Sequence, residues 1–103
     1  MIKVSVEYRG SGFASLEVKG HANSGAFPHD LVCAAVSAVV TGACNAIEAG
    51  DAFHITLEDG HALIEAPAGV NEHDETVLET LIIQLKTIEE SNKGYLEIKE
   101  RKN

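Results

Sequence analysis

The chain has 103 residues, which suits one domain, and a formal net charge of −8 from 16 acidic and 8 basic side chains. This acidic balance argues against electrostatic binding to nucleic acid or to an anionic membrane, and it favours a basic protein or peptide as partner. Apolar residues make up 45 % of the chain, as expected for a folded globular domain. No apolar run is long enough for a membrane span and no secretory signal opens the chain, so we expect a cytoplasmic protein.

The first nineteen residues have the pattern of a β-hairpin. Apolar and polar residues alternate over residues 2–9 and again over residues 14–19, with Gly10 and Gly12 between them. A period of two is typical of strands with one buried face.

A loop and a long helix are expected next. Residues 20–29 have neither strand nor helix period and contain Gly25 and Pro28, so we expect a loop. Asp30 has the chemistry of a helix N-cap, which predicts a helix from Leu31 to about Ala49. This helix is apolar on nearly all sides and therefore expected to be buried, with close packing at Gly42.

The second half of the chain repeats this pattern. Residues 53–58 and 62–64 alternate around Asp59-Gly60, which predicts a second hairpin with a type I′ turn. Apolar residues at helical spacing follow Glu72, and residues 95–99 form the last expected strand. The order predicts an α+β fold, ββαββαβ, with two helices in a two-layer arrangement on a mixed, mostly antiparallel sheet, formed by residues 1–103 as a single domain.

Cys33 is the residue with the most reactive predicted environment. With Asp30 as the cap, Cys33 is the third helical residue, where the helix dipole and the unpaired backbone N–H groups stabilise a thiolate. Either His21 or His29 is a candidate base and proton donor, with those N–H groups as an oxyanion site. Strand parity puts His21 on the face opposite Val18 unless Gly20 breaks the register.

Structural roles compete with these functional ones. A cysteine in a helix rich in Ala and Val is often a small core residue, and this is our interpretation of Cys44. The two cysteines are expected to be about 16 Å apart along the helix, which excludes a disulfide between them. Ser37 shares a helix face with Cys33, although a serine within a helix often bonds its own backbone.

Metal binding is the rival chemistry at this place. His21, His29, Asp30 and Cys33 are all zinc-competent side chains, but their spacing matches no standard zinc motif. We therefore expect no metal and no cofactor. The remaining histidines, His54, His61 and His73, are expected on strand surfaces or at a helix start without partners.

Two stretches together resemble one known family. Gly20-His21-Ala22 and the run from Asp30 to Ala38, DLVCAAVSA, are combined with the order ββαββαβ. In these features the whole chain resembles the ribosomal-processing cysteine protease family, Prp.

The resemblance implies a homodimeric bacterial endopeptidase that removes a short N-terminal extension from a large-subunit ribosomal protein. By position it makes Cys33 the nucleophile and His21 the general base and acid, with Asp30 and Ser37 in supporting places. The family's mobile, substrate-ordering loop corresponds to Ala22, Asn23, Ser24, Gly25, Ala26, Phe27, Pro28 and His29.

Two other hypotheses remain beside the protease. One is a non-enzymatic, dimeric, ribosome-associated binding protein in which the helix of small residues is an interface. The other is a zinc-dependent hydrolase.

Overall fold

The computed structural model describes residues 1–20 and 27–102, and only the backbone of residues 27–30. The elements follow the predicted order, with a short 3-10 turn, η1, after the first helix. They are β1 (Ile2–Arg9), β2 (Gly12–Lys19), α1 (Phe27–Ala46), η1 (Gly50–Ala52), β3 (His54–Glu58), β4 (His61–Glu65), α2 (Glu72–Ser91) and β5 (Leu96–Lys102).

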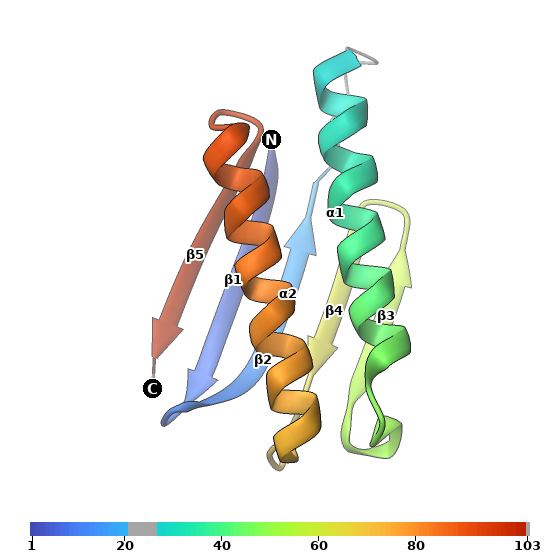
Figure 1. Ribbon diagram of the computed structural model, residues 1–103, viewed down its shortest axis with the longest axis vertical. Helices are drawn as coiled ribbons and strands as arrows, with labels where there is room; N and C mark the ends of the chain where they lie inside the picture. Colours follow the sequence, from blue (N-terminus) through green and yellow to red (C-terminus); the bar gives the residue numbers. More distant parts are fainter. Residues whose placement is uncertain (21–26, 103) are drawn as a thin grey trace.

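The strands form one mixed sheet covered on one face. Their order is β3-β4-β2-β1-β5; β1 and β5 are parallel, and the other neighbouring pairs are antiparallel. Both helices pack side by side on the same face of the sheet (Figure 1). The predicted α+β two-layer fold is confirmed.

The core lies between the helices and this face of the sheet. The alternation in β1 buries Ile2, Val4 and Val6 to 2 % exposure or less. Leu78, Leu81 and Leu85 of α2 are completely buried above the strands, at the spacing of three and four that places residues on one helix face.

The last strand is longer than predicted. β5 continues to Lys102 because it pairs in parallel with β1 from Ile2, opposite Leu96, to Tyr8, opposite Lys102. The residues after Ile98 in β5 are all charged. They therefore lack the alternation of apolar and polar residues from which a strand is predicted, although their backbone is paired.

Helix α1 is buried on one face only, so the expectation of an all-round buried helix is wrong for the single chain. Val32, Val36 and Val40 are 2 to 5 % exposed and face the sheet. The opposite face is in the outer layer and exposes Ala38 and Gly42. A Cβ at Gly42 would meet no atom within 4 Å, so the close packing expected there is also absent within the chain.

The turn between β3 and β4 differs from the predicted type. Gly60 has a φ of 76°, but Asp59 has no positive φ. A type I′ turn needs positive φ at both central residues, so the type I′ prediction is wrong, whereas the predicted hairpin is confirmed.

Gly20 joins the end of β2 to this turn. Its N–H donates to the Gly60 carbonyl over 3.1 Å, and its φ of 107° ends the extended conformation of the strand. A Cβ at Gly20 would lie 2.7 Å from the Met1 carbonyl oxygen. Glycine is therefore required at this position both by the dihedral angle and by the approach of another backbone segment.

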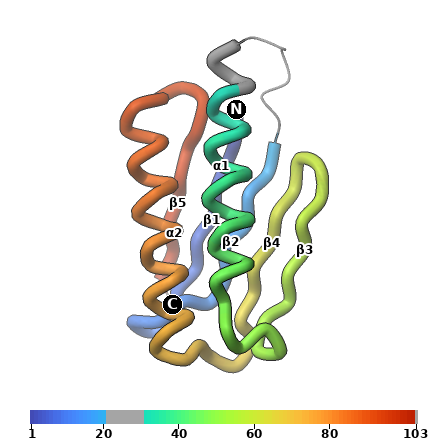
Figure 2. The backbone as a smooth tube through the Cα atoms, turned by 45° about the vertical axis from the view of Figure 1, so that its right-hand side comes forward, coloured from blue at the N-terminus to red at the C-terminus, as the bar shows by residue number. Residues whose placement is uncertain are grey.

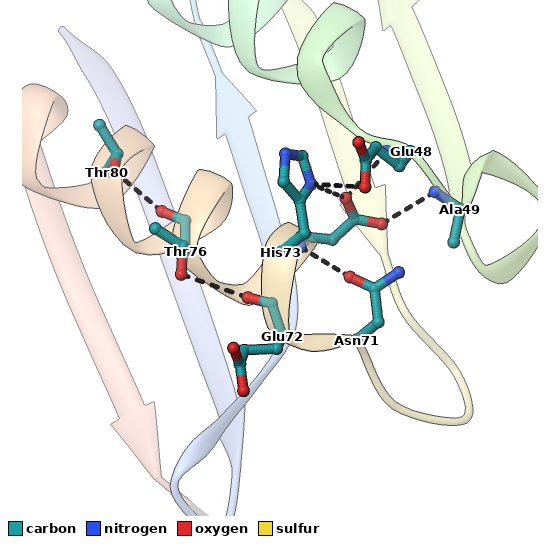
Figure 3. Close-up of polar contacts among 8 residues, drawn as sticks. Glu48, Ala49, Asn71, Glu72, His73, Thr76 and Thr80 are labelled. Atoms are coloured by element: carbon teal, nitrogen blue, oxygen red, sulfur yellow. Dashed lines mark hydrogen bonds and ion pairs between the residues drawn. The ribbon is translucent and has the colours of Figure 1, made fainter.

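Asp74 ties the end of α1 to the start of α2. Its completely buried carboxylate accepts hydrogen bonds from the N–H groups of Glu48 and Ala49 over 2.8 and 2.9 Å. Its own N–H donates to the Asn71 side chain, the N-cap of α2, over 2.7 Å. The imidazole of His73 lies 2.9 Å from Asp74 and 3.3 Å from the Glu48 carboxylate (Figure 3).

These contacts shift the pKa values of both side chains. Burial alone would raise the pKa of Asp74, but the hydrogen bonds from Glu48, His73 and Ala49 outweigh it and hold this pKa below its usual value of 3.8. The hydrogen bond to Asp74, aided by the charge of Glu48, raises the pKa of His73 above its usual 6.5. The charged pair is thus favoured in the folded chain.

We predict that Gly20→Ala destabilises the fold more than Gly69→Ala. Gly69 has a similar φ of 113°, but a Cβ there meets nothing within 4 Å, so this control carries the dihedral strain without the backbone clash. Strain of this kind costs about 1 to 3 kcal/mol, and Gly20→Ala adds the displacement of Met1. Urea unfolding of both variants measures the difference, and equal free energies of unfolding would contradict a role for the Met1 contact.

We also predict that Asp74→Asn lowers the free energy of unfolding by about 1 to 3 kcal/mol, because an amide cannot accept the same set of hydrogen bonds. The stabilisation from the ionised Asp74 carboxylate is present above pH 3.8 and is lost as the pH falls through the lowered pKa of Asp74 in the folded chain. The stabilisation from protonated His73 is present below pH 6.5 and is lost as the pH rises through the raised pKa of His73 in the folded chain. The gap between wild type and variant should therefore be largest between these two values. Urea unfolding from pH 3 to 8 checks this, and a gap independent of pH would count against the ion pair.

Candidate active site

The start of α1 differs from the sequence prediction. The helix begins at Phe27, four residues before Leu31, so Phe27, Pro28 and His29 belong to the helix instead of the predicted substrate loop. Proline is tolerated in the first turn of a helix, where its missing N–H would have no intrahelical partner. Asp30 is consequently a residue within the helix, and its prediction as the N-cap is wrong.

This correction changes the electrostatic setting of Cys33. Counted from Phe27, Cys33 is the seventh residue of α1 and lies in the second turn, beyond the predicted third position. The influence of the helix dipole is concentrated in the first turn. Cys33 therefore lies outside the turn in which this influence is strongest.

Cys33 lines a cavity between α1 and the β3–β4 hairpin. The cavity has a volume of about 180 Å³ and is bounded on the helix by Cys33, Ser37 and Thr41. Val18 and Ala62 also contribute to its lining, from β2 and β4. Cys33 is half-buried.

The end of β2 and the hairpin turn complete the cavity. Gly20, to which His21 is bonded, lines it together with Asp59 and Gly60. His21 itself and the predicted loop residues Ala22 to Ala26 lie outside the described residues. Gly20 has a positive φ, so the alternation of side chains along β2 ends at Lys19. The argument that placed His21 on the face opposite Val18 therefore does not apply.

Ser37 occupies the place expected from helix geometry. It follows Cys33 by one turn of α1, is exposed, and lines the same cavity. A hydroxyl at this position can donate to or accept from a bound peptide. For Asp30 the structure describes the backbone within α1 and nothing of the carboxylate.

The two cysteines have different environments. Both are present as thiols, in agreement with the expected absence of a disulfide between them. Burial raises the pKa of the Cys44 thiol, and a raised pKa lowers the fraction of reactive thiolate. Cys44 thus fits the structural role expected from the sequence.

Two of the remaining histidines have partners, contrary to the sequence expectation. His61 lies 2.7 Å from the carboxylate of Glu17. His61 is opposite Lys19 in the sheet, and its neighbour Ala62 pairs with Val18, which faces the helices. The His61 side chain is therefore on the open face of the sheet, while the residue also contributes to the lining of the Cys33 cavity. His54 is exposed.

His73 belongs to the one cluster of metal-ligating side chains found among residues 1–20 and 31–102. Glu48, His73 and Asp74 have ligand atoms within 4.8 Å of one another. Both carboxylate oxygens of Asp74 already accept main-chain hydrogen bonds. These bonds explain why the three side chains lie together: they join the end of α1 to the start of α2.

The contribution of the hairpin to the cavity was missed from the sequence. Leu57 and Gly60 line the cavity because β4 pairs with β2 in the register that brings His61 opposite Lys19. Such pairing joins residues about forty positions apart, and no local pattern in the sequence specifies it.

Comparisons with known proteins identify the family. The family model described as cysteine protease Prp matches residues 1–97. A ribosomal processing cysteine protease Prp from Staphylococcus aureus is 35 % identical over 95 residues, which are 87 % of this chain and 90 % of that protein. No helix in the described part of the chain is long and apolar enough to span a membrane.

Two solved structures share the fold over nearly all of both chains. The S. aureus ribosomal processing protease Prp in complex with a substrate peptide superimposes with a TM-score of 0.86 at 30 % identity, covering 97 % of this chain and 99 % of that one. The same protease with a covalently linked product peptide gives a TM-score of 0.83 at 29 % identity, with the same coverage. The chain described here belongs to the Prp family of cysteine proteases.

Proposed function

We propose that this protein is an endopeptidase that removes the short N-terminal extension of a bacterial large-subunit ribosomal protein. The observation that carries the proposal is the half-buried thiol of Cys33 in a cavity that also includes Gly20, the neighbour of His21. Membership of the Prp family and the peptide complexes of the S. aureus relative support the reaction class. The net charge of −8 suits a substrate attached to a basic protein.

In the proposed mechanism, Cys33 is the nucleophile and His21 the general base and acid. His21 takes the thiol proton, and the Sγ of Cys33 bonds to the scissile carbonyl carbon. The C–N bond then breaks as His21 protonates the leaving amine, which leaves a thioester. Water hydrolyses the thioester, giving its proton to His21 and restoring the thiol; the covalently linked product peptide in the S. aureus relative supports such an intermediate.

Ser37 and Asp30 have supporting roles in this proposal. Ser37, exposed on the cavity wall, is placed to bind the substrate backbone beside the thiol. Asp30 precedes Cys33 by three residues on α1, a spacing that puts both on neighbouring parts of one helix face. We assign the substrate-contacting role in this proposal to Ala22–Ala26, the residues between His21 and α1.

We further propose a homodimer formed through the outer face of the helices. Residues 31–46 of α1 contain no charged side chain, although an outward helix face normally carries charges. Between α1 and α2 lies a groove of about 710 Å³, lined on α1 mainly by alanines and Gly42. A second copy would cover this surface, which the single chain leaves exposed. The proposed enzyme is a single domain of residues 1–103 and acts in the cytoplasm.

We predict that Cys33→Ala abolishes cleavage of a ribosomal protein that carries the extension, with a loss on the order of 10³-fold or more. The matched control is Cys44→Ala on the same helix, which should retain activity. Mass spectrometry of the substrate detects the new N-terminus. Cleavage by the Cys33→Ala variant at the rate of the wild-type protein would exclude the thiol mechanism.

Two other outcomes separate the rival hypotheses. A stable complex of the wild-type protein with the substrate, without a new N-terminus, would favour the non-enzymatic binding protein. Loss of cleavage after exhaustive chelation would favour the zinc hydrolase.

We predict that Gly42→Glu shifts the protein from dimer to monomer. The substitution puts a charge on the uncharged face of α1, has room within the chain, and improves helix propensity by up to about 1 kcal/mol. Lys99→Gln, at an exposed position of β5, changes the net charge by the same amount and should leave the dimer intact. Light scattering after size exclusion gives the masses; a wild-type monomer, or a dimeric Gly42→Glu variant, would contradict this interface.

A further inference from the structure

The outer strand β3 has an open edge. It pairs with β4, and among the described residues no strand pairs with its other side. Figure 2 shows β3 at the margin of the sheet, beyond α1. An open edge presents a row of main-chain donors and acceptors that another extended chain can join.

The hydrogen-bond pattern shows which residues of β3 face this edge. Successive residues of an antiparallel strand direct their main-chain groups alternately to either side. In the β4 segment, the Gly60 carbonyl accepts from Gly20 over 3.1 Å and the Ala66 N–H donates to Ala14 over 2.9 Å, so even-numbered positions bond towards β2.

The odd-numbered residues of β4 consequently bond towards β3. Their partners are Glu58, Thr56 and His54, opposite His61, Leu63 and Glu65. The alternate residues Ile55 and Leu57 therefore direct their N–H and C=O groups outwards, away from the sheet.

The side chains of the same two residues are also uncovered. Ile55 is opposite the buried Ile64, and Leu57 is opposite Ala62, so both point to the helix-bearing face. They are nevertheless 38 % and 48 % exposed. Two outward backbone positions thus coincide with two exposed apolar side chains.

This edge is continuous with the Cys33 cavity. Leu57 lines that cavity together with Cys33, so a peptide with its scissile bond at the thiol has β3 as the adjacent open strand. Main-chain pairing with alternate side-chain pockets is a general mode of recognising extended peptides. Five residues of β3 span roughly 17 Å, which is enough for several peptide residues.

We propose that the peptide substrate binds as an added strand along β3, pairing with the outward main-chain groups of Ile55 and Leu57. Alternate peptide side chains then contact the apolar surface of these two residues, and the remainder of the peptide enters the Cys33 cavity. The proposal rests on the endopeptidase function above and adds to it the residues that hold the substrate chain.

The test is an N-methyl scan of a peptide covering the extension and the cleavage site. Each amide within five residues on either side of the scissile bond is methylated in turn, and the Kd is measured by fluorescence anisotropy with the Cys33→Ala variant. Methylation removes one donor, so we expect the Kd to rise about tenfold at every second position on one side of the scissile bond, with little change between. A Kd pattern without this period of two, or no binding of the unmodified peptide, would overturn the added strand.

A backbone substitution in the protein provides the second measurement. Leu57→Pro removes an outward N–H without removing a bond to β4, and proline is tolerated on edge strands in this orientation. Leu57→Ala is the matched control, since it shortens the side chain but keeps the N–H. We expect Leu57→Pro to weaken peptide binding about tenfold more than Leu57→Ala; equal Kd values would count against main-chain pairing.

The same peptides and protein variants distinguish the endopeptidase proposal from the added-strand proposal. Cleavage of the unmodified peptide by the wild-type protein tests the endopeptidase alone. Cleavage together with a scan that lacks the period of two rejects the added strand and leaves the endopeptidase in place. Periodic binding without cleavage rejects the endopeptidase and retains the strand.

Discussion

The hydrogen bonds of Asp74 fix the position of the helix that carries Cys33. Its buried carboxylate accepts the first two N–H groups that follow the turn at the end of α1, at Glu48 and Ala49, while its backbone is held by the N-cap of α2. A buried carboxylate is tolerated only when its oxygens are satisfied, and here the main-chain donors come from the segment that directly follows α1. The distal end of α1 is thus anchored, and its valines lie on the sheet on the way to Cys33.

The unequal size of the two layers determines where ligands can bind. Strand β3 is at one edge of the five-stranded sheet, and its Ile55 and Leu57 remain 38 % and 48 % exposed. The boundary between α1 and the β3–β4 hairpin forms the cavity at Cys33. On the other side of α1, the small uncharged side chains that allow close helix packing remain at the surface. The site and the proposed dimer face are therefore opposite sides of one helix.

The sequence predicted the elements well because their signals are local. Alternation in residues 2–9 and helical spacing after Glu72 each reflect one buried face, and both elements form as expected. The shared helix face of Cys33 and Ser37 was also predicted from their spacing alone, and both residues line the same cavity.

The failures have two physical origins, one local and one in contacts between distant segments. The helix start was misplaced because Pro28 was treated as part of a loop, although a first-turn proline is compatible with a helix. His73 and His61 acquired carboxylate partners from other elements, Glu48 and Glu17, that only the tertiary fold brings near. The cavity wall at Leu57 depends on strand register in the same way.

Because of the contact between Gly20 and Gly60, the position of the backbone beside His21 does not depend on the side chains that line the cavity. This contact joins the segment before His21 to the hairpin turn through main-chain atoms only, so it does not depend on the side chains at Leu57, Glu58 or Asp59. Substitutions at those three positions can alter what the cavity accepts while the backbone next to His21 keeps its place. The hairpin side chains that line the cavity can therefore vary without a change in the backbone contact that holds Gly20.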